Sequence, residues 1–175
     1  MPNWCKNNLR IKDNGEKTLE LLTYVKDEKG NFTMNKAVPM PKELEDTESP
    51  NTESAEKRKK LIEKYGADNW YDWHCNNWGV KWDASESGFW KDGDDWMISF
   101  QTPWGPPCEF IRKLSKQFPK MTFIVQFADE GIGSPPLGQC TYTNGTEYYE
   151  DPGDRDSAEA FANSVWDEEW VNGYD

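Results

Sequence analysis

Two successive strand–helix–strand patterns constrain the fold of this chain more than any other feature. In the first, apolar and polar side chains alternate along residues 3–12, as in a strand with one buried face. Residues 16–26 carry apolar side chains at helical spacing, and residues 32–38 form an apolar run that Pro39 and Pro41 end. We therefore expect a strand, a helix and a strand in that order.

The second pattern lies in the middle of the chain. Residues 96–102 alternate as a strand, Pro106 and Pro107 suit the first turn of a helix, and residues 121–128 alternate again. Two such units predict an α+β fold, a ferredoxin-like βαββαβ sandwich whose four antiparallel strands carry two helices on one face. The opposite face of that sheet then needs a cover.

A C-terminal extension follows the core. We expect a hairpin that turns at Asn144-Gly145 and then an amphipathic, acidic helix over residues 156–169. The expected organisation is a core over residues 1–130 and an extension over residues 131–175 that packs on it. The last helix is one candidate cover for the open face, and a tryptophan-rich insertion in the core is the other.

That insertion spans residues 42–95 and is expected between the second and third strands, with a short helix over residues 55–65. Within it, residues 69–83 hold four tryptophans and the only histidine of the chain. A Thr-Pro-Trp-Gly-Pro-Pro stretch follows at residues 102–107. Six residues of these two stretches are candidate ligand-binding residues: Asn77, Trp78, Lys81, Trp82, Asp83 and Trp104.

Two interpretations of these residues stay open. Tryptophan rings beside amide, ammonium and carboxylate groups form a mixture that stacks planar ligands and hydrogen-bonds their edges. Alternatively, both stretches form rigid turns that pack on the sheet, with each indole N–H bonded to a backbone carbonyl. The first interpretation predicts a ligand site and the second a structural support.

The charge of the chain is −12 and is concentrated near its end. Residues 147–175 contain ten acidic side chains and one basic side chain, Arg155. This imbalance argues against direct nucleic-acid binding, which needs a basic surface, and permits docking on a basic partner. The candidate partner-binding residues are Glu159, Asp167, Glu168 and Glu169.

Several other classes of protein are disfavoured. There is no apolar run long enough to span a membrane and no apolar signal-peptide core, so we expect a cytoplasmic protein without membrane association. Four scattered cysteines without a Cys-x-x-Cys pair predict free thiols, and we expect neither a metal nor a cofactor. No phosphate-binding loop or catalytic motif is present. The sequence therefore disfavours enzymatic activity but leaves it open.

Several motifs together resemble a known family. They include Met1-Pro2-Asn3-Trp4-Cys5 at the start, Asn77-Trp78-Gly79-x-Lys81-Trp82-Asp83, and Thr102-Pro103-Trp104-x-Pro106-Pro107. Over roughly residues 1–140 the chain is similar to the YubB-like family of small phage and plasmid proteins. The resemblance implies a ferredoxin-like core and an origin in a phage or mobile element, and it implies no activity.

Two functional hypotheses follow. In the first, the chain is a non-enzymatic interaction protein that binds and modulates a host protein, such as a defence enzyme, through its acidic surface. In the second, it is a small-ligand or nucleotide-binding protein, or an enzyme, that uses the tryptophan, lysine and aspartate cluster. Single-stranded nucleic-acid binding on an open sheet face is a third idea, and the charge disfavours it.

Overall fold

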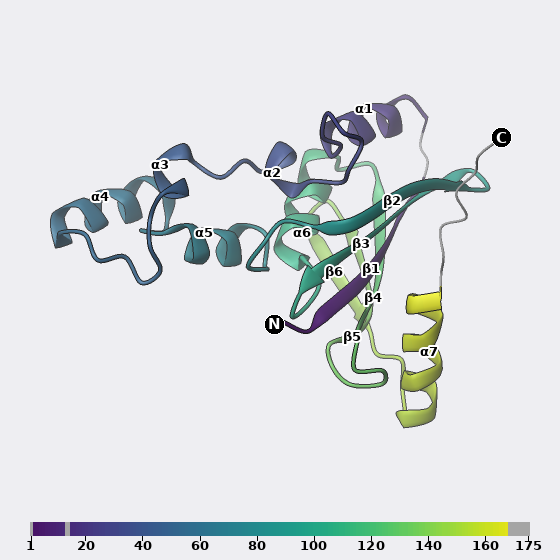
Figure 1. Cartoon of the computed structure of the whole chain (residues 1–175). Helices are drawn as coiled ribbons and strands as arrows, with labels where there is room; N and C mark the ends of the chain where they lie inside the picture. The colour runs from purple at the N-terminus through teal and green to yellow at the C-terminus, as the bar shows by residue number, and fades with distance from the viewer. Residues whose placement is uncertain (1, 13–14, 168–175) are drawn as a thin grey trace.

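The computed structural model describes residues 2–12 and 15–167, and a six-stranded antiparallel sheet lies at its centre (Figure 1). The strands lie in the order β2-β3-β1-β4-β5-β6. The first four strands in this order, β2-β3-β1-β4, are arranged as in a ferredoxin-like sandwich. The predicted fold class is therefore confirmed. The strand bounds are β1 Trp4–Ile11, β2 Ser85–Asp92, β3 Asp95–Pro103, β4 Thr122–Asp129, β5 Leu137–Thr143 and β6 Thr146–Glu150.

One face of the sheet packs against helices α1 (Glu16–Tyr24) and α6 (Cys108–Gln117). The register explains the core. Leu9 of β1 pairs with Ile98 of β3 and with Val125 of β4, so three fully buried side chains meet in one row. Burying each such side chain contributes about 1.5–3 kcal/mol. The helices complete this core with Leu21, Val25, Phe110, Ile111 and Leu114.

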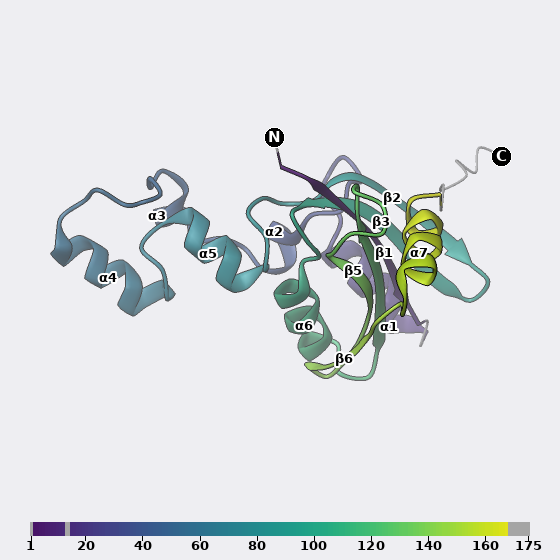
Figure 2. The same cartoon turned by 90° about the horizontal axis from the view of Figure 1, so that it is seen from below.

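Helix α7 (Arg155–Asp167) covers the opposite face, on the right of Figure 2. Its apolar stripe forms a second, smaller core with β4 and β5. Two hydrogen bonds anchor it: Asn8 Nδ2 donates to the carbonyl of Val165 at 2.9 Å, and Trp166 Nε1 donates to the carbonyl of Asp129 at 3.1 Å. Of the two candidate covers, the C-terminal helix occupies this face.

The second predicted strand is wrong. Residues 32–38 make only an isolated bridge between Lys26 and Phe32, and Met34–Ala37 form a short helix, α2. The start of α2 is bound by the Asp83 carboxylate, which accepts hydrogen bonds from Thr33 Oγ1 at 2.6 Å and from the Met34 amide at 2.8 Å. Because Asp83 lies about fifty positions away, the local sequence could not reveal this contact.

The true second strand is β2, which the sequence had placed inside the insertion at residues 42–95. The tryptophan-rich residues 69–83 therefore lie between α1 and β2, and not between the second and third strands. Strand β2 is an edge strand that pairs only with β3, and its register shifts between Ser85 and Gly88. Both its faces are partly exposed, so its apolar and polar residues alternate too weakly to predict it.

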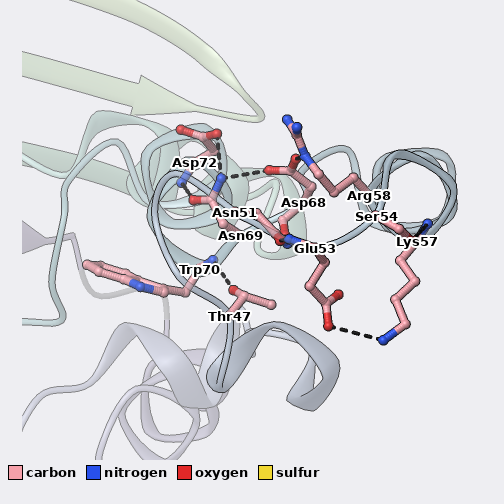
Figure 3. A network of polar contacts seen from close by, with 10 residues as sticks. All are labelled: Thr47, Asn51, Glu53, Ser54, Lys57, Arg58, Asp68, Asn69, Trp70 and Asp72. Carbon is pink, nitrogen blue, oxygen red and sulfur yellow. Dashed lines mark hydrogen bonds and ion pairs between the residues drawn. The ribbon is translucent and has the colours of Figure 1, made fainter.

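Helices α3 (Lys42–Glu45), α4 (Ala55–Tyr65) and α5 (Trp70–Asn77) form an arm, residues 42–77, that projects from one end of the sheet (Figures 1 and 2). The predicted helix over residues 55–65 is confirmed, although it has no fully buried residue. Polar contacts join α4 and the loop before it to Asp68, just ahead of α5 (Figure 3). Arg58 Nε donates to Asp68 Oδ2 at 2.6 Å, and the Asn51 side chain donates to the Asp68 carbonyl at 2.5 Å.

Candidate functional site: an aromatic platform at the base of the arm

Part of the tryptophan-rich stretch is structural. Helix α5 begins at Asn69, whose side chain accepts the Asp72 amide at 2.9 Å, and it buries Trp73 and His74. Trp78, at the end of the helix, is 2% exposed and donates its indole N–H to the Val38 carbonyl at 2.9 Å. Its ring stacks on His74 with centroids 4.0 Å apart. These contacts place Trp78 in the core, where no ring face is open to a ligand.

The turn after Trp78 joins the arm to the sheet. Gly79 has φ +85°, and a Cβ atom there would lie 3.3 Å from the amide nitrogen of Glu109 in α6. The Trp78 carbonyl also accepts the Phe110 amide at 3.2 Å. A glycine is thus required because the backbone turns into the left-handed region and approaches α6 closely. This junction sets the direction in which the next residues point.

Two more of the predicted ligand residues have structural partners. Asp83 binds the start of α2 and also accepts the Ala84 amide at 2.8 Å. Asn77 donates to the Trp73 carbonyl at 2.8 Å, and its Oδ1 accepts a hydrogen bond from Lys113 Nζ. Both polar side chains are therefore engaged in hydrogen bonds within the protein.

The remaining three predicted residues do come together. Trp82 and Trp104 stack with centroids 6.1 Å apart, and both are exposed, at 39% and 49%. The Lys81 ammonium lies 4.5 Å from the Trp82 ring centre and 5.4 Å from that of Trp104. Tyr71 and Trp70 of α5 approach the same ammonium at 5.9 and 6.0 Å. We call these four rings around Lys81 the aromatic platform.

Trp104 is held in a strained conformation. Its φ is +64°, a region in which a bulky side chain costs about 1–3 kcal/mol. A buried polar chain holds the turn in place: Asn7 Nδ2 donates to Thr102 Oγ1 at 2.8 Å, and that hydroxyl donates to the Gly105 carbonyl at 2.6 Å. The Trp104 amide also donates to the Asn3 carbonyl at 2.9 Å. The fold therefore directs this indole outward at an energetic cost.

Lys81 is half-buried, and its ammonium is surrounded by rings. Within the described residues, no carboxylate forms an ion pair with it. Each ring face attracts the cation by about 0.5–2 kcal/mol, depending on its exposure to water. An ammonium that aromatic faces hold in place, without a carboxylate, can accept an external anionic group. The platform thus offers stacking surfaces and one positive charge.

His74 supports the platform from beneath. Its Nδ1 lies 2.7 Å from the Lys81 carbonyl, so this nitrogen carries the proton and donates it. Burial lowers the pKa of His74, although the bond to the Lys81 carbonyl and the charge of Asp83 act in the opposite direction. The ring is therefore neutral at pH 7 and serves as a packing partner for Trp78.

The predicted acidic residues lie elsewhere. Glu159 and Asp167 are on α7, on the side of the sheet away from the arm in Figure 1, and Glu159 forms an ion pair with Arg155 at 3.1 Å. Glu168 and Glu169 lie outside the described residues. The acidic residues and the aromatic platform are therefore two separate surfaces.

The predicted ligand residues do not line one cavity. A cleft of about 650 Å³ beside β2 is lined by Asp83, Asp27 and Glu86, among others, but by neither Trp82 nor Trp104. In the part of the chain that the structure describes, no three His, Cys, Asp or Glu side chains are placed to share a metal ion. None of the described helices has the length and apolar character needed to cross a bilayer. The Trp82 and Trp104 indoles of the platform are exposed, and neither lines the cleft beside β2.

Comparison with known proteins places the chain in a family. Residues 77–169 match the family described as the ferredoxin-like domain in Api92-like protein. The chain belongs to this family. A crystal structure of protein Api92 from Yersinia pseudotuberculosis is similar in fold, with a TM-score of 0.55 and 10% sequence identity over 88% of this chain and all of that one. No curated protein matches the sequence.

The family match extends further toward the C-terminus than the resemblance seen in the sequence, which stopped near residue 140. It includes β5, β6 and the described part of α7. Lys81, Trp82 and Trp104 lie within the matched residues, and Trp70 and Tyr71 lie before them. The platform thus combines residues of the Api92-like domain with residues of the arm.

Trp70 and Tyr71 were not among the predicted site residues. A signal for them was present, because Asn69 followed three positions later by Asp72 is typical of a helix start. A helix from that point places Trp70 four positions before His74, on the same face. The approach of these two rings to the Lys81 ammonium beside Trp104 could not be found in this way, since it depends on how the chain turns after α5.

Proposed function

We propose that the protein is an interaction module that binds a segment of another protein on its aromatic platform. The observation that carries the proposal is the exposed Trp82–Trp104 stack, which the backbone presents at a strained position. Strained backbone that the surrounding structure holds in place is found more often at binding and active sites than elsewhere. Tryptophan is also enriched among the few residues that carry most of the energy of a protein interface.

The chemistry of the platform narrows the partner. Lys81 supplies a positive charge without a carboxylate partner in the described part of the chain, and the rings around it supply apolar area. A segment that presents a carboxylate beside an apolar side chain matches both features. The carboxylate would form a charge-assisted hydrogen bond with Lys81, and the apolar group would pack on the indoles.

A second candidate function uses the acidic surface. On α7, Asp167 is exposed and Glu159 is half-buried, and the region from residue 147 to the end of the chain carries one basic residue against ten acidic ones. Such a surface attracts a basic partner at long range. The resemblance to phage and plasmid proteins favours a host protein as the partner in either case.

Affinity capture from host lysate distinguishes the two surfaces. The platform variant carries Trp82→Ala and Trp104→Gly, and the acidic variant carries Glu159→Gln and Asp167→Asn. Tyr148→Ala is the matched control, because Tyr148 is an aromatic side chain that is 65% exposed on β6, away from the platform. Our proposal predicts one protein that the wild type, the acidic variant and the control capture and that the platform variant loses.

Two results would overturn the platform proposal. If the platform variant still captures the partner and the acidic variant does not, the acidic surface is the docking site. If nucleotides or oligonucleotides raise the melting temperature of the wild type and not of the platform variant, the ligand is a nucleotide and not a protein. Circular dichroism of each variant checks that the fold is intact.

A further inference from the structure

The two edges of the sheet differ in how they are protected. Edge strand β2 is interrupted by the register shift between Ser85 and Gly88, and the Phe32 amide, from outside the sheet, donates to Ser87 Oγ at 2.9 Å. A bulge of this kind hinders pairing with another strand. Edge strand β6 pairs with β5 without any shift, contains no proline, and has all five of its residues exposed. The β6 edge is therefore open to a further strand.

The hairpin determines which backbone groups of β6 face outward. Asn144 and Gly145 form its two-residue turn, with φ of +49° and +80°. The residues that flank such a turn exchange both backbone hydrogen bonds, and bonded pairs then alternate with non-bonded ones along the two strands. The outward groups of β6 are therefore the N–H and C=O of Glu147 and Tyr149. Among the described residues, none is hydrogen-bonded to these groups.

We propose that β6 pairs, antiparallel, with β6 of a second copy of this chain, about a twofold axis at Tyr148. The outward groups then meet in two equivalent pairs, each joining Glu147 of one copy to Tyr149 of the other, and each pair exchanges both of its backbone hydrogen bonds. Tyr148, which is 65% exposed, faces Tyr148 of the second copy across the axis. An aromatic pair at such a position contributes about 0.2–1 kcal/mol. This inference does not rest on the proposed function.

The acidic residues of β6 fit this register. Two carboxylates directly opposite each other would destabilise the pairing of the strands. With the axis at Tyr148, Glu147 lies opposite Tyr149 of the second copy and Glu150 lies opposite its Thr146. No glutamate of β6 therefore faces another, and the strand is complementary to itself.

A lysine beside the turn adds charge complementarity. The Lys116 side chain of α6 lies against the turn, since a Cβ atom at Gly145 would collide with it, and Lys116 forms no ion pair among the described residues. The register places Asp151 of the second copy opposite Gly145. Because side chains alternate, Asp151 lies on the same face as Glu147, whose carboxylate is bound by Arg112 of α6. Each copy thus brings a carboxylate to the lysine of the other.

Sedimentation velocity of the full chain under reducing conditions tests the association. A short strand pair gives a small interface, so the concentration series extends to about 0.2 mM. The proposal predicts a mass that rises from that of one chain toward that of two. A single-chain mass throughout the series overturns the proposal.

Two substitutions at one position test the backbone pairing. Glu147→Pro removes an outward amide and leaves the β5–β6 bonds in place, because this amide faces away from β5. Each copy then loses one hydrogen bond of the interface, so the dissociation constant should rise by about tenfold. Glu147→Gln keeps the amide and also loses the Arg112 ion pair, so it is the control and should stay within about threefold of the wild type. Equal constants for the two variants, with circular dichroism showing both folded, contradict the pairing.

A disulfide tests the register. In Tyr148→Cys the two introduced thiols face each other in a non-hydrogen-bonded pair whose Cα atoms are about 4.5 Å apart, within the range of a disulfide. Oxidised glutathione should link the copies, and peptide mass spectrometry should find residue 148 joined to residue 148. Thr146→Cys is the control on the same face, because its counterpart lies about four residues, ~13 Å, along the pair. A dimer that does not link at residue 148, or equal linking of both variants, contradicts the proposal.

Discussion

The two groups of tryptophans in this protein come from neighbouring residues and have opposite environments. Trp73 and Trp78 are buried against His74, and the indole N–H of Trp78 is bonded to a backbone carbonyl. Trp82 and Trp104 stack on each other in contact with water, around a lysine. The first group has the burial and the hydrogen bond of a structural support, whereas the second group leaves much of its indole surface exposed.

The comparison shows that an unusual cluster of aromatic residues can serve two purposes at once. The buried pair docks the arm on the sheet through the junction with α6. The exposed pair then lies at a position that this docking determines. A change in the buried group should therefore alter both stability and binding, and a change in the exposed group should alter binding alone.

The largest effect is expected from Trp78→Ala. It removes a fully buried indole, leaves a cavity and leaves the Val38 carbonyl without its donor, so the free energy of unfolding should fall by about 3–5 kcal/mol. Equilibrium urea unfolding measures this change. The control Trp78→Phe keeps most of the packing and should cost less. A loss below about 1 kcal/mol for the alanine variant would mean that Trp78 is not a core residue.

The polar contacts of the arm should give the next largest effect. Arg58→Met leaves the Asp68 carboxylate, whose side chain is 7% exposed, without its cation, so α4 should lose about 1–3 kcal/mol of local stability. Hydrogen exchange of the α4 amides measures it. The matched control is Lys59→Met, because the exposed Lys59–Glu63 pair at 3.8 Å contributes little. Equal protection in the two variants would contradict the role of Arg58.

We expect His74 to have a smaller effect on the free energy of unfolding, and this effect depends on pH. Because its pKa is lowered in the folded protein, the unfolded chain binds the proton more readily. Its contribution to stability is therefore complete above the unfolded pKa of about 6.5 and is lost as pH falls through the lower folded value. Urea unfolding between pH 7 and pH 5 should show this loss. His74→Gln should remove the part of the slope due to His74, and an unchanged slope would contradict the assignment.

The sequence predicted the parts of the fold that depend on local pattern. Alternation predicted β1, β3 and β4, and helical spacing predicted α1 and α6, which are five elements of the ferredoxin-like core. The second strand was misplaced because α2 is held by Asp83 from far along the chain, and because β2 is an irregular edge strand. Distant partners and edges leave little trace in local sequence.

The candidate site was predicted only in part for the same reason. Residue types identified Lys81, Trp82 and Trp104, but they also selected Trp78 and Asp83, whose side chains have structural partners. Whether an indole faces the core or water depends on the positive φ of Trp104 and on the docking of α5. Neither can be obtained from periodicity.

The most direct test of this account is the free energy of unfolding of Trp104→Gly, measured beside that of Trp78→Ala. Glycine at φ +64° relieves backbone strain of about 1 kcal/mol, which offsets the lost stacking on Trp82. The account predicts a change within about 1 kcal/mol of the wild type for Trp104→Gly, although binding is lost. A loss of about 3 kcal/mol or more, as for a buried tryptophan, would show that Trp104 supports the fold and would contradict the platform.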